Sequence, residues 1–138
     1  MATDKLELAR TVLEEFSATQ RASDWFADDV VFDFSEFRGW IEESEYHGRN
    51  GFDQQLERWT APFDSWAIEV TDLRDPGGDD VLVVGVQRGV VKGTGAVVEM
   101  ALADVVTIRD DKIVRIRIFA AAEDAYEAAG LEPPARSG

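Results

Sequence analysis

Three long runs of strand-forming residues, separated by two very short connections, constrain this chain more than any other feature. The runs are Val81–Lys92, Ala96–Arg109 and Lys112–Phe119. Gly93-Thr94-Gly95 separates the first two, and Asp110-Asp111 separates the last two. Connections this short allow only antiparallel hairpins, because a parallel pair needs a crossover of a dozen residues or more. The sequence therefore predicts a meander of three long antiparallel strands.

Helical patterns precede this meander, and one short helix follows it. Apolar residues at helical spacing predict the helices, and a period of two predicts the strands. The expected helices are Asp4–Thr19, a second one that Asn50 caps and that ends near Pro62, and Ala121–Ala129; the additional strands are Val30–Phe34 and a run from Ser65. Helices followed by a run of strands favour an α+β fold, with helices on one face of a curved sheet.

One domain is expected to span residues 1–138, with 4–131 structured and 132–138 forming a tail. A chain of this length suits a single domain and is long enough to bury a core. The segment Glu36–Gly51 is polar and has no clear period. We therefore expect it to be a long loop, of the kind that is either functional or mobile.

Charge and composition narrow the classes of partner. The chain has 28 acidic and 14 basic residues, and its net charge of −14 repels nucleic acid and anionic membrane surfaces. It has no cysteine, and His47 is its one histidine, which excludes thiolate and multi-histidine metal sites and leaves only carboxylate-rich ones conceivable. We interpret the acidic clusters as solvated surface charge. We therefore expect no nucleic acid, membrane, metal or cofactor. The N-terminal residues lack an apolar leader, which predicts a cytoplasmic location.

Asp104 is the strongest candidate for a catalytic residue. It shares one face of its predicted strand with Leu102 and Val106, and it is the polar member of that apolar face. Burial among apolar neighbours raises the pKa of a carboxyl group, which suits a general acid or base. The alternative is structural: Arg88 or backbone groups would then pair with the carboxylate.

Aromatic side chains are numerous enough to line an apolar ligand site or simply to fill the core. The candidate ligand-binding residues are Trp25, Phe32, Phe34, Trp40, Tyr46, Trp59, Leu102 and Val106. Trp40 and Tyr46 lie in the aperiodic segment, so we expect them at the entrance of a pocket. Asp33 lies between Phe32 and Phe34, so we expect it on the opposite face, in a structural or solvent-facing position.

Four motifs in sequence order resemble the nuclear transport factor 2-like superfamily and its SnoaL-like group. They are Trp25–Val31, Tyr46–Gly51, Asp104–Val114 and Ala125–Leu131, and the resemblance covers roughly residues 4 to 131. It implies a cone-shaped α+β barrel, the cystatin-like or SnoaL-like fold. In that fold a curved mixed or antiparallel sheet, with helices on its concave face, encloses a pocket.

A homodimer through the convex face of the sheet is also expected. The resemblance implies one, and the residues favour it independently, because the long strands are apolar or small on both faces. For instance, Ala101, Ala103 and Val105 lie opposite Leu102 and Val106. One layer of helices covers only one face, so the other face would meet a second copy.

No catalytic set of the superfamily is complete in this sequence. By resemblance to the ketosteroid isomerases, the position of the catalytic base falls on Phe34, so the base is missing. The position of the oxyanion-hole aspartate falls on Asp104, but the partner tyrosine has no counterpart near residues 10–12. The catalytic groups of the epoxide hydrolases and polyketide cyclases are missing too. Since the fold does not decide function, two hypotheses remain. One is an enzyme of isomerase, cyclase or lyase type, using Asp104 on an apolar small molecule. The other is a non-catalytic ligand-binding or dimeric accessory module.

Overall fold

The computed structural model describes residues 4–19, 24–35, 37 and 45–132. In chain order, the elements are α1 (Lys5–Thr19), β1 (Phe26–Asp33), β2 (Glu45–His47), α2 (Gly48–Thr60), β3 (Phe63–Arg74), β4 (Asp80–Val91), β5 (Val97–Arg109), β6 (Lys112–Ile118) and α3 (Ala122–Ala128). The side chain of Asp4 caps α1 by accepting a hydrogen bond from the backbone N–H of Leu6, at 2.9 Å.

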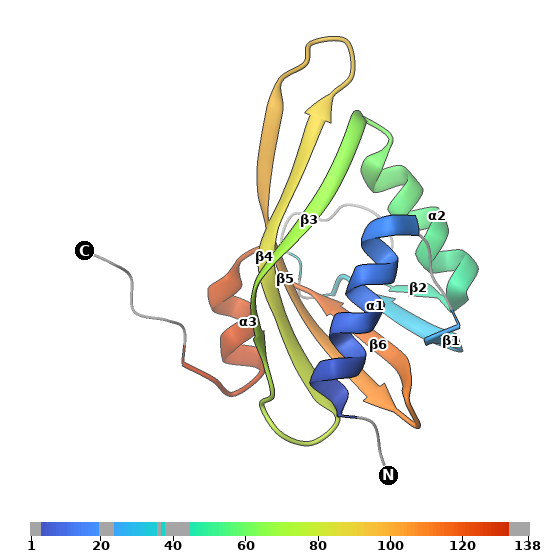
Figure 1. The fold of residues 1–138 in the computed structure, drawn as a ribbon, viewed down its shortest axis with the longest axis vertical. Coiled ribbons are helices and arrows are strands. Elements are labelled where there is room, and N and C mark those ends of the chain that lie inside the picture. The colour runs from blue at the N-terminus through green and yellow to red at the C-terminus, as the bar shows by residue number, and fades with distance from the viewer. Residues whose placement is uncertain (1–3, 20–23, 36, 38–44, 133–138) are drawn as a thin grey trace.

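The six strands form one curved sheet in the order β2-β1-β6-β5-β4-β3 (Figure 1). Neighbouring strands are antiparallel, except that β1 and β6 run parallel. The α+β class and the antiparallel meander β4-β5-β6 are as the sequence predicts. The two edge strands, β2 and β3, do not pair with each other. The barrel implied by the resemblance is therefore an open one.

The two tight connections of the meander have the backbone conformations that hairpins require. Asp110 and Asp111 both have positive φ, 52° and 59°, as in a two-residue type I′ turn between β5 and β6. Gly93 and Gly95, at φ of 81° and 70°, turn the chain from β4 into β5. This second hairpin is long and extends beyond the rest of the sheet (Figure 1).

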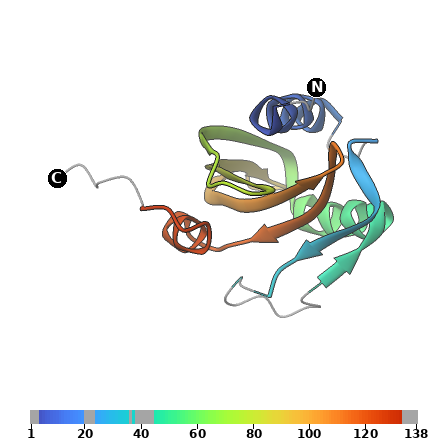
Figure 2. The same cartoon turned by 90° about the horizontal axis from the view of Figure 1, so that it is seen from below.

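Helices cover both faces of the sheet. We call the face that carries α1 and α2 the concave face; Leu8 of α1 and Phe52 of α2 are buried in the core there. On the opposite, convex face, Tyr126 of α3 packs with Leu82 and Val105 in a second cluster. Figure 2 shows α1 and α3 on opposite sides of the sheet. The expectation that all helices lie on the concave face is therefore wrong for α3.

Several predicted boundaries need correction. The predicted loop Glu36–Gly51 contains β2, and α2 begins at Gly48 with His47 as its N-cap residue. Asn50 lies inside the first turn of α2 and does not cap it. The first strand begins at Phe26, four residues before the prediction. A three-residue strand such as β2 is too short to show a period of two, which is why the pattern missed it.

Candidate functional site

A cavity of about 120 Å³ lies between the concave face and the two helices α1 and α2. Its wall draws on α1, α2 and five of the six strands, and aromatic rings form much of it. The aromatic residues of the lining are Phe16, Phe26, Phe32, Phe34, Phe52, Trp59 and Trp66. Several of these rings contact one another edge to face or at a tilt: those of Phe32 and Phe52, for example, have centroids 4.8 Å apart and planes inclined by 46°.

Only three polar side chains belong to the lining among the described residues: Gln55, Gln87 and Asp104. The described lining contains no lysine, arginine or histidine. Asp104 is thus its one titratable group. The cavity is apolar, with one acid and two amides set into it.

Asp104 projects from the concave face of β5, in the same row as Val83 of β4 and Ile118 of β6. Its side chain keeps some accessible surface, as fits a residue at a cavity wall. Burial raises the pKa of Asp104 from 3.8 to about 7, and no hydrogen bond or charge from another described residue opposes this rise. Arg88, the structural partner considered above, pairs instead with Glu99, with Nε and Oε1 at 3.2 Å. The carboxyl group therefore populates both protonation states near neutral pH.

Gln87 is held in place by three hydrogen bonds. Its Oε1 accepts one from the indole N–H of Trp59 at 2.8 Å and a second from that of Trp66 at 3.3 Å. Its Nε2 donates to the backbone oxygen of Ala101 at 3.0 Å. The amide thus fixes two tryptophan rings of the cavity wall, one from α2 and one from β3.

Gln55 occupies the buried side of α2 and is only 1% exposed. It lies between Phe52 and Trp59 on the face of the helix that lines the cavity. Its Nε2 atom is buried and has no hydrogen-bond acceptor within the described part of the chain.

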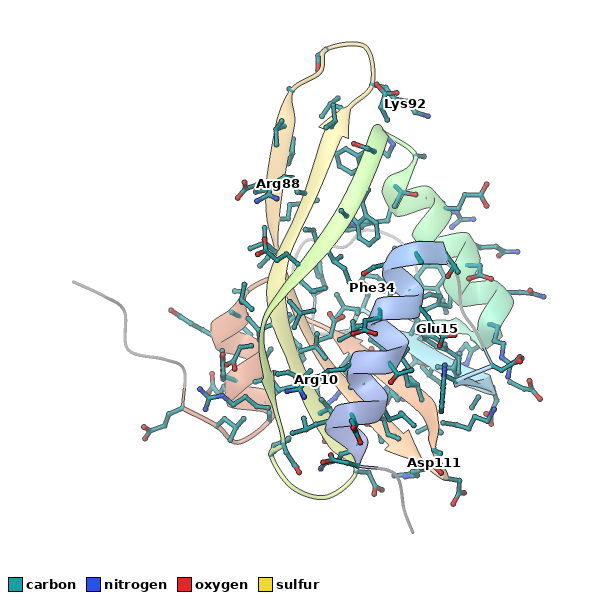
Figure 3. The ribbon with its side chains drawn as sticks, in the orientation of Figure 1. Arg10, Glu15, Phe34, Arg88, Lys92 and Asp111 are labelled. Atoms are coloured by element: carbon teal, nitrogen blue, oxygen red, sulfur yellow. The ribbon has the colours of Figure 1, made fainter. Side chains whose placement is uncertain are left out.

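The structure brings together most of the residues that the sequence singled out. Asp104, Phe32, Phe34, Trp59, Leu102 and Val106 all line the cavity. Figure 3 labels Phe34 among the side chains between the helices and the sheet, and Arg88 extending away from α1 and α2. Trp40 lies outside the described residues.

Trp25 and Tyr46 do not belong to the cavity lining. Trp25 lies in the turn before β1, and its backbone oxygen accepts a hydrogen bond from Ile113 at 2.8 Å. Tyr46 belongs to β2 at the edge of the sheet, where it is buried with its ring centroid 5.8 Å from that of Phe34. It therefore packs behind the cavity wall instead of standing at an entrance.

Asp33 lies on the convex face, as the alternation predicts, but it is buried and not solvent-facing. Its Oδ1 accepts a hydrogen bond from the backbone N–H of Ser35 at 2.8 Å, and its Oδ2 pairs with Arg115. Burial favours a raised pKa for Asp33, but the hydrogen bonds from Ser35 and Arg115 and the guanidinium charge outweigh it and lower the pKa. Arg115 also reaches Glu45 at 3.4 Å. Asp33 is therefore a structural acid.

Sequence reasoning missed both glutamines. The signal for Gln55 was available, because it follows Phe52 by three residues and so shares the apolar stripe of α2. Gln87 lies two residues from Gly85 and four from Val83, on the concave face of β4. The feature that singles out Asp104, a polar residue on an apolar face, is present at these two positions as well.

The described residues form neither a cluster of metal ligands nor a helix able to cross a membrane. No group of three His, Asp or Glu side chains among them could hold a metal ion. None of the described helices combines the length and apolar character that a membrane crossing needs.

Comparisons with known proteins identify the fold and the family. The family model of the SnoaL-like domain matches residues 12–116. Among curated proteins, the sequence has no significant match. Solved structures share its fold at low sequence identity, and they include the following three.

The first is a protein of unknown function with a cystatin-like fold from Xanthomonas campestris. It has 20% identity and a TM-score of 0.68, over 95% of this chain and 100% of that one. The second, a protein of ketosteroid isomerase-like fold from Catenulispora acidiphila, was solved in complex with trimethylamine; it has 17% identity and a TM-score of 0.62, over 91% of this chain and 97% of that one. The third, TerC, was co-crystallised with polyporic acid; it has 17% identity and a TM-score of 0.67, over 91% of this chain and 97% of that one. At these identities, the likeness establishes the fold alone.

Proposed function

Because the chain belongs to the SnoaL-like domain family, whose fold leaves the reaction open, we propose a function from the cavity itself. The cavity binds one small apolar molecule, and Asp104 exchanges a proton with it. The single observation that carries this proposal is the state of Asp104. It is the one titratable group of the described lining, and its pKa is about 7 because it is buried without a charged partner.

The size of the cavity supports a ligand, or a ligand moiety, of about one ring. Its volume is about 120 Å³. A cavity of roughly 150 Å³ with leucine, isoleucine and phenylalanine walls accommodates benzene. Flat aromatic walls such as Phe32 and Phe52 favour a cyclic or unsaturated molecule, which can stack on them.

A carboxyl group in this setting suits proton transfer to or from carbon. A general acid–base group works best when its pKa lies near the working pH, since both forms are then present. One such group can remove a proton from the carbon next to a carbonyl and return it at another carbon. The apolar wall holds water away from the intermediate. We therefore propose isomerase-type or lyase-type chemistry on a neutral apolar substrate.

Two of the structurally similar proteins were crystallised with small organic molecules, trimethylamine in one case and polyporic acid in the other. This supports a small-molecule ligand for the fold in general. A cytoplasmic location and independence from cofactors remain predictions from the sequence.

A second candidate function is a non-catalytic binding module. The observation that favours it is that Asp104 has no second acid or base beside it in the described lining. Reactions that need an acid and a base at the same time, such as many cyclisations, lack the second catalytic group in the described lining. The binding module shares the ligand with the enzyme hypothesis and differs only in the fate of the proton.

We also propose that the chain forms a homodimer through the part of the convex face that α3 leaves uncovered. A shallow groove there is lined by Val86, Arg88 and Val90 of β4 with residues of β3. Val97 of β5, next to Val90 in the sheet, is 61% exposed. Apolar side chains from neighbouring strands thus meet solvent on this part of the long hairpin, on either side of the ion pair between Arg88 and Glu99.

Deuterium exchange tests the proposed chemistry. Cyclic ketones, enones, lactones and epoxides are first screened by thermal shift at pH 7. The ketones and enones that bind are then incubated with the protein in D₂O, and loss of the proton next to the carbonyl is followed by NMR. We expect the wild type to catalyse exchange and Asp104→Asn to lose at least a hundredfold in rate while still binding.

Glu99→Gln is the matched control, because Glu99 is an exposed acid outside the cavity. It should exchange at the wild-type rate. Exchange that persists in Asp104→Asn would refute the catalytic role. Binding without any exchange in the wild type would favour the binding module.

A further inference from the structure

Gln55 carries a buried, unpaired hydrogen-bond donor at the wall of an apolar cavity. Its side chain is 1% exposed, it lines the cavity, and its Nε2 atom has no acceptor among the described residues. Burying an amide nitrogen without a partner destabilises a folded chain. An apolar residue here would instead continue the buried stripe formed by Phe52 and Leu56 without that penalty. Packing alone therefore gives no reason for a glutamine at this position.

Gln87, in the same cavity lining, is a glutamine whose side-chain hydrogen bonds are made to the protein. Its oxygen accepts from two indole N–H groups, and its nitrogen donates to the backbone oxygen of Ala101. Gln87 thus makes its hydrogen bonds within the cavity wall. Gln55 has the same side-chain amide in the same lining, but its nitrogen donates no hydrogen bond to a described protein group.

We propose that the Nε2 group of Gln55 donates a hydrogen bond to a carbonyl oxygen of the bound molecule and so selects and orients it. This inference rests on the proposed function and names its substrate class: a neutral, single-ring ketone, enone or lactone. The described lining has no cationic side chain that could pair with an anionic ligand. An ammonium ligand carries no acceptor, so it would leave the donor of Gln55 unpaired.

The geometry of the lining gives the ligand two polar contacts from different sides. Gln55 comes from α2 and Asp104 from β5, and apolar and aromatic side chains make up most of the remaining wall. A carbonyl compound held by Gln55 would be polarised by the hydrogen bond, which acidifies the neighbouring C–H group. Asp104 is the one described titratable group of the lining that could take up that proton. Gln55 would thus bind and activate the substrate, and Asp104 would move the proton.

Binding constants of three probes of similar size test this proposal. Cyclohexanone carries an acceptor, methylcyclohexane carries none, and cyclohexylamine carries a cation at neutral pH. Each is titrated into the wild type and into Gln55→Leu at pH 7, with Gln55→Met in parallel as a variant closer in shape. Gln54→Leu is the matched control, because Gln54 is the preceding residue of α2 and is exposed.

We expect the Gln55 variants to bind cyclohexanone about tenfold more weakly, the loss of one net hydrogen bond, and methylcyclohexane at least as tightly as the wild type. Gln54→Leu should change neither. The same ketone-to-hydrocarbon affinity ratio in wild type and Gln55 variants would overturn this inference alone. So would a preference for cyclohexylamine that persists in Asp104→Asn, because the carboxamide of Gln55 would then present its oxygen to the cation. Failure of the wild type to bind any probe would overturn the proposed function as well.

Discussion

Replacing Asp104 by asparagine removes the one ionisable group of the described cavity lining and nearly preserves its shape. In the folded chain, burial raises the pKa of Asp104 from 3.8 to about 7. In the unfolded chain the carboxyl group is solvated and has its ordinary pKa. Between these two values the folded carboxyl group holds a proton that the unfolded one has lost. The free energy of unfolding therefore falls as the pH rises through this window, and the loss is complete above about pH 7.

The size of this change in the free energy of unfolding follows from the difference between the pKa values of Asp104 in the folded and unfolded chain. Each pH unit corresponds to about 1.4 kcal/mol, so full ionisation of Asp104 destabilises the fold by up to about 4 kcal/mol. Asparagine carries no charge at any pH. The stability of Asp104→Asn relative to the wild type should therefore improve by about 2–3 kcal/mol between pH 5 and pH 8.

Urea denaturation of both proteins at several pH values measures this difference. Groups other than Asp104 titrate in both proteins, so subtracting one curve from the other isolates the effect of Asp104. Glu99→Gln, which removes an exposed acid outside the cavity, controls for the loss of one negative charge. An Asp104→Asn difference that does not vary from pH 5 to pH 8 would refute the reasoning, because the carboxyl group would then be as well solvated as an ordinary one.

Three further substitutions test the architecture around the site. Gln87→Leu leaves two indole N–H groups without their acceptor and should lower the free energy of unfolding by about 2–3 kcal/mol in urea titrations; an unchanged midpoint would contradict the hydrogen-bond network. Gly85→Ala would place a Cβ atom 1.9 Å from the backbone oxygen of Glu69 and should cost about 3 kcal/mol, whereas Gly51→Ala, with room for its Cβ, should fold normally. Light scattering should give twice the 15.3 kDa mass of one chain, and Val86→Glu should return it to the monomer; a wild-type monomer at micromolar concentration would refute the dimer.

The long strands could be predicted closely because their pattern is strong. The predicted run Val81–Lys92 corresponds to β4 (Asp80–Val91), and the predicted run Lys112–Phe119 corresponds to β6 (Lys112–Ile118). Runs of eight or more residues rich in β-branched side chains, with glycines or paired aspartates at their ends, leave little choice of structure. β2 could not be found this way, since three residues at a sheet edge are held by their pairing with β1 and carry no periodic signal of their own.

The candidate site was predictable in part for the same reason. Alternation along β5 places Leu102, Asp104 and Val106 on one face, and the cavity lies against that face. Alternation gives the face of a residue but not what covers it. Asp33 was therefore assigned to the correct face, yet its burial and its pairing with Arg115 depend on neighbours from β6 that a local pattern does not reveal.

The parallel pairing of β1 with β6 has a consequence for how the chain is made. Asp33 and Arg115, which meet across this pair, are 82 residues apart in sequence. At a synthesis rate of 5–20 residues per second, the nascent β1 waits about 4 to 16 seconds for its neighbour. Throughout that interval Phe26 and Phe32 have no β6 to pack against, and Ile116, which neighbours Phe32 in the sheet and lines the same cavity, does not yet exist. A ribosome-bound chain that ends before β6 cannot enclose a ligand, and one edge of its aromatic strand lacks the neighbour that pairs with it in the complete fold.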